Sequence, residues 1–204
     1  DAATAAANCS VRSLQVSAPA GSTNTLLVTD RAAVSPLTTS KPLVVDRGGL
    51  LLVTNSTLSI GDTFDVLGGS VKMESGLIDS TPKLINIRVG RTGGATGTFT
   101  QNGGNVDTFG LTVAAIANAQ GIYTLNAGTV YSPFLTTLGD ALNSTGTLAI
   151  VSGQFIATND LTKIGNFGSG ILNQTGGTSS FSFFSLGDNF GGLGTGNISG
   201  GQFT

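Results

Sequence analysis

The sequence has few charged residues, no histidine, no tryptophan and a single cysteine, Cys9. Without histidine the chain cannot build a His-based catalytic triad or a Cys/His metal site, and one cysteine cannot form an intramolecular disulfide. Charged residues make up 10% of the chain, compared with about 25% in typical soluble domains. The formal net charge is −2 and there is no basic cluster, which argues against a nucleic-acid partner.

Long apolar runs are also missing. No stretch approaches the roughly 18 residues of a membrane-spanning helix, so the sequence predicts no membrane span. The first residue is Asp1 rather than Met, which favours a processed or excerpted chain.

The single cysteine, Cys9, has two interpretations, a small buried thiol or a link to another chain. We expect no cofactor and no metal.

Glycine is abundant, with 31 residues, and it recurs in a regular pattern. A glycine followed two residues later by an apolar residue opens each of seven units of about 20–28 residues, and a second glycine follows seven residues after most openers. We assign the opening glycines to Gly49, Gly69, Gly97, Gly121, Gly146, Gly170 and Gly196. The apolar residues that follow them are Leu51, Val71, Phe99, Tyr123, Leu148, Leu172 and Ile198.

Each unit closes with an apolar residue, a glycine and a polar residue, as in Leu138-Gly139-Asp140. We assign Ile116-Ala117-Asn118 to this position in the one unit that lacks the glycine. Three short segments separated by glycines favour strands, because each glycine inside a helix costs about 1 kcal/mol.

The pattern predicts an all-β fold, a three-sided parallel β-helix or β-solenoid, right-handed by the general preference of parallel crossovers. Residues 49–204 would form the regular repeats. Residues 1–48, with three prolines, would form an N-terminal cap and the first irregular coils.

Two repeat units, GTFTQNGGNV at 97–106 and GILNQTGGTS at 170–179, carry a resemblance to a known family. With the apolar-Gly-polar triplets that precede them, they resemble the glycine-rich repeats of bacterial autotransporter-associated, PEP-CTERM-type surface proteins. The segment DAATAAANCSVRSLQV at 1–16 resembles the lead-in to such repeats. The resemblance implies a β-solenoid that is secreted and associated with the cell surface, and it implies no catalytic residue.

Enzymatic function is weighed on the residues themselves. Parallel β-helices that cleave polysaccharides need clustered carboxylates. The candidates here are Asp140 and Asp188, which lie two coils apart in the column formed by the polar residues of the closing triplets. Corner Asp and Asn residues more commonly bond to nearby backbone and to one another, so we expect a structural ladder and no enzyme. An ice-binding Thr-x-Thr array begins at Thr98 and Thr100 but does not continue in the next units.

Aromatic residues near the C-terminus offer one surface candidate. Strand alternation over Phe181, Phe183 and Phe184 predicts that the first two point inward and that Phe184 faces outward, where it could contact a sugar or another subunit.

The last coil suggests how the protein works. Residues Gly196, Ile198, Gln202, Phe203 and Thr204 complete an opening motif without a capping segment. An open strand edge needs a cover, so either the precursor continues or another subunit docks there. We expect a secreted structural subunit that stacks head to tail with itself into surface fibres or a sheath. The alternatives are a non-catalytic polysaccharide-binding adhesin passenger and, third, a polysaccharide lyase or hydrolase.

Overall fold

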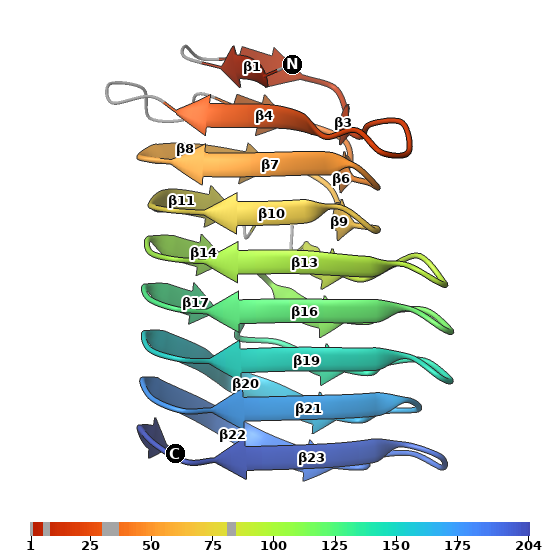
Figure 1. Ribbon diagram of the computed structural model, residues 1–204. Coiled ribbons are helices and arrows are strands. Elements are labelled where there is room, and N and C mark those ends of the chain that lie inside the picture. The colour runs from red at the N-terminus through yellow and green to blue at the C-terminus, as the bar shows by residue number, and fades with distance from the viewer. Residues whose placement is uncertain (1, 6–8, 30–36, 81–84) are drawn as a thin grey trace.

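The protein folds as a β-solenoid, an all-β stack of parallel strands (Figure 1). The structure is a computed structural model that describes residues 2–5, 9–29, 37–80 and 85–204. In Figure 1 the strands of the front face run from right to left while the chain descends, so the coils wind right-handed. The fold prediction is thereby confirmed. No helix long and apolar enough to cross a membrane occurs among these described residues.

Three columns of strands form the three faces. Face one comprises β1 (Ala2–Ala5), β4 (Asn24–Thr29), β7 (Gly49–Thr54), β10 (Ser70–Met73), β13 (Thr96–Gln101), β16 (Gln120–Leu125), β19 (Thr145–Ile150), β21 (Ser169–Gln174) and β23 (Leu193–Ile198). Face two comprises β2 (Cys9–Val11), β5 (Leu37–Thr39), β8 (Ser56–Ile60), β11 (Gly76–Asp79), β14 (Asn105–Asp107), β17 (Thr129–Tyr131), the first halves of β20 (Gln154–Ile164) and β22 (Thr178–Leu186), and β24 (Gln202–Phe203). Face three comprises β3 (Leu14–Val16), β6 (Leu43–Val45), β9 (Phe64–Val66), β12 (Asn86–Val89), β15 (Gly110–Val113), β18 (Thr136–Leu138) and the second halves of β20 and β22.

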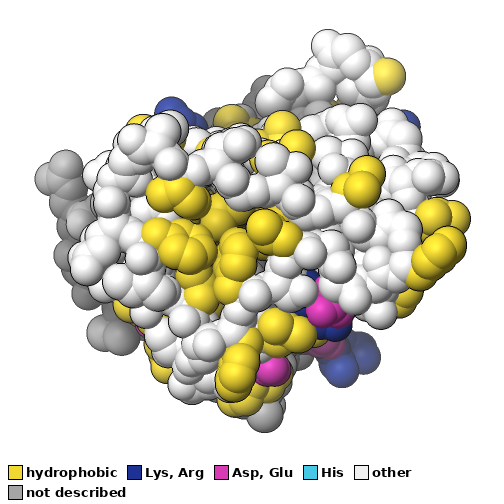
Figure 2. All heavy atoms as spheres, turned by 90° about the horizontal axis from the view of Figure 1, so that it is seen from below, with side chains coloured by type: hydrophobic (Ala, Val, Ile, Leu, Met, Phe, Trp, Pro, Cys, Tyr) yellow, Lys and Arg dark blue, Asp and Glu magenta, His cyan; other side chains and the backbone are white. Residues whose placement is uncertain are grey.

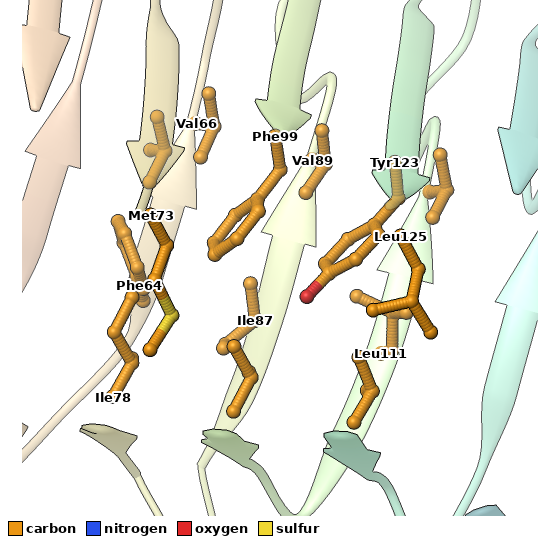
Figure 3. Close-up of a cluster of buried hydrophobic side chains, with 14 of the residues drawn as sticks. Phe64, Val66, Met73, Ile78, Ile87, Val89, Phe99, Leu111, Tyr123 and Leu125 are labelled. Atoms are coloured by element: carbon orange, nitrogen blue, oxygen red, sulfur yellow. The ribbon is translucent and has the colours of Figure 1, made fainter. Parts of the chain in front are cut away.

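The core consists of apolar columns that run along the solenoid axis. Alternate residues of each strand point inward, and the in-register pairing stacks equivalent residues coil upon coil. Figure 3 shows Phe99 and Tyr123 on successive strands of face one, with their rings stacked at 4.6 Å between centroids. The predicted inward column from Leu51 to Leu172 is almost completely buried.

Two buried polar side chains near the corner between faces one and two, Gln101 and Tyr123, are hydrogen-bonded. Tyr123 Oη donates to Gln101 Oε1 at 2.8 Å, and Gln101 Nε2 donates to the backbone oxygen of Gly104 at 2.9 Å. Burial raises the pKa of Tyr123 well above its usual range, so its hydroxyl stays protonated. A buried hydrogen-bond donor and acceptor are therefore satisfied without water.

The second glycine of each repeat turns the corner between faces one and two. These glycines have positive φ angles, and each α-carbon lies against the backbone of the coil above: Gly76, Gly104, Gly128, Gly153, Gly177 and Gly201. A Cβ on Gly128 would lie 2.1 Å from the Gly104 backbone oxygen. Only glycine satisfies both the φ angle and the close approach.

One closing triplet was assigned to the wrong residues. Ala114 N donates to the Val89 oxygen as Gly139 N donates to the Val113 oxygen, so the residues equivalent to Leu138-Gly139-Asp140 are 113–115. Ala114 takes the glycine position with a φ of 63°. The sequence assignment of 116–118 was wrong because it required a polar third residue, and the residue of this coil equivalent to Asp140 is Ala115.

The final coil is shifted by two residues from the sequence alignment. Gly194, not Gly196, pairs with Gly170, and Gly196 lies opposite Leu172 in the inward column. The second glycine, Gly201, then falls seven residues after its opener, as in the other coils. The shift places Ile198 opposite Gln174, one inward position further along the strand.

The described parts of residues 2–48 continue the three columns upward. They form two further coils, β1 to β3 and β4 to β6, each paired in parallel with the next. Pro36 lies outside the described residues. No separate capping segment lies over β1, β2 and β3 in the part of the chain that the structure describes.

Candidate interface at the C-terminal end

The C-terminal end of the solenoid presents open strand edges. β23 is the last strand of face one, and β24 pairs only with β22. Face three ends one coil earlier, with the second half of β22, so the last described coil has two sides only. Backbone N–H and C=O groups along such edges are ready to pair with another strand.

Aromatic side chains of the core come to the surface at this end. Phe181, Phe184 and Phe203 form a cluster in which each pair of ring centroids is 5.2 Å apart. Phe203 is 40% exposed, and Ile198 and Leu186 beside it are also exposed. Figure 2 shows this end as a central group of hydrophobic side chains surrounded mostly by backbone and uncharged side chains, with acidic and basic side chains on one side. The end face therefore resembles a section through the core.

The residues predicted for this interface are brought together by the last two strands. Gly196 and Ile198 lie on β23, while Gln202 and Phe203 form β24 opposite Thr178 and Ser179. Thr204 closes the pairing, because its N–H donates to the Ser179 oxygen and its own backbone oxygen accepts from Phe181 N. Phe181, Phe184 and Leu186 also belong to this end of the solenoid, but they were not assigned to the interface from the sequence.

The predicted inward orientation of Phe181 is confirmed, because this residue packs against the core, but the predicted orientations of Phe183 and Phe184 were wrong. Phe184 pairs with the fully buried Thr162 and packs against the core, whereas Phe183 is 65% exposed. The pairing of β22 with β20 is irregular between faces two and three, where three residues of β20 oppose one of β22. The chain bends there, and simple alternation no longer holds across the bend.

The N-terminal end carries Cys9, which is exposed and free of a disulfide. Cys9 is the first residue of β2 and pairs with Leu37, which in turn pairs with Leu58. The same column continues through Ile78, Val106, Val130, Phe155 and Ser179 to Phe203. Cys9 and Phe203 are thus the two ends of one inward column.

The carboxylates considered for catalysis take part in a corner ladder. Asn166 Nδ2 donates to Asp140 Oδ1 at 2.7 Å, and Asn189 donates to Asn166 in the next coil. Asp188 pairs with Lys163 at 2.6 Å, and the hydrogen bond from this lysine lowers the pKa of Asp188. These contacts fit the structural interpretation of the column.

A different carboxylate pair was missed from the sequence. Asp79 and Asp107 are register partners on neighbouring strands of face two. The pKa of Asp107 is raised mainly by its partial burial and, to a lesser extent, by the neighbouring charge of Asp79. Each follows the inward residue nine positions after an opener, which is the signal that could have revealed the pair. The described residues contain no group of three or more acidic, His or Cys side chains placed to hold a metal ion.

Together the faces, columns and open ends define a β-solenoid with an apolar end surface. No family model, curated protein or solved structure matches the chain. The interpretation of the end surface therefore rests on its geometry.

Proposed function

We propose that the protein is a secreted structural subunit that stacks head to tail with copies of itself into a fibre or sheath at the cell surface. The observation that supports this most is the exposed apolar surface of Ile198 and Phe203, which lie on the unpaired edges of β23 and β24. Apolar surface beside an unpaired strand edge favours pairing with a further strand, which a second copy of the chain would supply.

The register of the strands gives the arrangement of such a junction. The N-terminal β1 occupies the column of β23, and β2 occupies the column of β24. A second copy placed below the first would add its β1 and β2 at the spacing that joins coils within one chain, about 4.8 Å. Phe203 of one copy would then lie against Cys9 of the next.

This arrangement bears on the two interpretations of Cys9. In a head-to-tail junction Cys9 meets a phenylalanine rather than a second thiol, so the stack needs no disulfide. The junction would also leave a gap one strand wide on face three, beside Phe184 and Leu186, because that face has no strand in the last coil. The stabilising contacts of the junction therefore come from faces one and two.

Electron microscopy of the isolated chain over a range of concentrations tests the proposal. The expected result is filaments with an axial repeat of about 43 Å, nine strand spacings of about 4.8 Å, because face one has nine described strands. The matched variant Phe203→Asp places a charge at the junction and should leave short rods only. Rods alone in both proteins, at every concentration, would contradict end-to-end stacking.

A second candidate function is binding of a neutral polysaccharide by face one. Its outward residues from β13 to β23 are uncharged and mostly hydroxyl, amide or aliphatic side chains, including Thr98, Thr124, Thr147 and Asn173. Asn197 Nδ2 donates to Asn173 Oδ1, which joins two outward amides on neighbouring strands of this face. Cosedimentation with insoluble neutral polysaccharides, compared with a Thr147→Lys and Asn173→Lys double variant, would detect this activity.

A further inference from the structure

The loops that lead from face three to face one carry large exposed hydrophobic side chains in three successive coils. Leu142, Phe167 and Phe190 lie in the loops before β19, β21 and β23, and all three are exposed. Phe190 is the extreme case, with 102% relative exposure. Figure 1 places these loops at the right-hand corner, and Figure 2 shows hydrophobic side chains protruding at that edge. We call Leu142, Phe167 and Phe190 the corner ridge.

A groove lies within the corner ridge. It has a volume of about 320 Å³ and is lined by Leu142, Phe167 and the exposed Leu193, together with the polar residues 143–145 and 169 and the glycines 168 and 191. None of its lining residues is charged. The corner thus offers a protruding aromatic side chain beside an uncharged recess that is lined by both apolar and polar residues.

We propose that the corner ridge is a lateral self-association surface, on which Phe190 of one copy enters the groove of a second copy. A two-fold contact requires one patch to be complementary to itself, and the Phe190 side chain next to a recess whose apolar walls are Leu142, Phe167 and Leu193 meets that requirement. The absence of charge in the groove removes the repulsion that would oppose two identical surfaces. The repeat of one ridge residue per coil also matches a partner with the same axial period, which another copy has.

The contact is small. A buried Phe contributes about 150–250 Å² and a stable interface needs about 800 Å² per partner, so pairs of single subunits should be weak. If subunits also stack end to end, as proposed above, many such contacts act together along two fibres, and their combined strength rises by avidity. Lateral pairing of subunits does not itself depend on that stacking.

The absence of tryptophan from the chain allows a direct test. A Phe190→Trp variant would carry the only indole, and we expect its emission to shift to shorter wavelength as protein concentration rises and pairs form in sedimentation velocity. The measurement uses a Phe203→Asp background, so that end-to-end stacking does not contribute. The matched control is Phe183→Trp in the same background, because Phe183 is also exposed, at 65%, on another face; its emission should stay that of solvated indole.

Each result has a separate meaning. An emission from Phe190→Trp that does not change with protein concentration, while the protein stays monomeric, overturns the lateral contact. A shift that appears at low protein concentration only when a soluble neutral oligosaccharide is added overturns it too, because the ridge would then be a sugar site. In microscopy of the otherwise unchanged chain, Phe190→Ser should abolish side-by-side bundles while single filaments persist. Bundles unaffected by Phe190→Ser contradict the inference without affecting the end-to-end proposal.

Discussion

The corner glycines should be the most sensitive positions outside the buried core of the solenoid, and the half-buried Gly128 gives the clearest case. Its φ is +90°, a conformation that costs an alanine about 1–2 kcal/mol. A Cβ would also lie 2.1 Å from the Gly104 backbone oxygen, which accepts the hydrogen bond from Thr129 N at 3.0 Å. Relief of that overlap requires the coils to separate, at a cost typical of overpacking, about 1–3 kcal/mol.

We therefore expect Gly128→Ala to lower the free energy of unfolding by about 2–5 kcal/mol. The control is Gly94→Ala, because Gly94 has a similar φ of +71° but no atom within 4 Å of an added Cβ. It should lose only the conformational part, about 1–2 kcal/mol. Urea denaturation followed by circular dichroism measures both values. Equal losses in the two variants would refute the claim that coil-to-coil contact, rather than φ alone, requires glycine at these corners.

Two further predictions concern polar groups. Thr162→Val should raise the free energy of unfolding by about 1 kcal/mol, because the Thr162 hydroxyl is buried without a partner. Thr136→Val should lower the free energy of unfolding, because it breaks the hydrogen bond to Ser132. Thermal denaturation of both variants checks these expectations, and a lower stability of Thr162→Val would contradict the first. Asp107 has a raised pKa in the folded protein, so its contribution to stability is present below the usual value of 3.8 and is lost as the pH rises through the folded pKa. Asp107→Asn should accordingly be more stable than the unchanged chain at pH 7 and equal to it at pH 3, and a variant that is less stable at pH 7 would show that this charge is stabilised by its surroundings.

The repeat was sufficient to predict the fold because each inward column imposes the same side-chain type at the same place in every coil. Phe99, Tyr123 and Leu148 could be aligned without a structure since buried positions tolerate only apolar residues there. Glycine is a weaker marker where it is frequent. Between 191 and 201 the chain has six glycines, and Gly196 was chosen as opener although Gly194 alone keeps the spacing to Gly201.

The candidate interface was predictable in part. Its location on the last two strands followed from the repeat, but the contribution of Phe184 did not, because the bend within β22 interrupts the alternation on which the orientation was based. The corner ridge could not be predicted for a similar reason. The loops that carry Leu142 and Phe190 have six residues each, whereas the loop that carries Phe167 has four, so no fixed spacing in the sequence reveals that these side chains protrude from one corner.

Disulfide trapping tests head-to-tail stacking most directly. The single substitution Phe203→Cys places a thiol at one end of the column that begins with the native Cys9, and strands about 4.8 Å apart lie within the Cα separation of about 4.4–6.8 Å that a disulfide needs. Under mild oxidation we predict a ladder of disulfide-linked multimers on a non-reducing gel, lost when Cys9→Ser is added. A chain that stays monomeric under oxidation, or links as strongly without Cys9, would contradict the stacking.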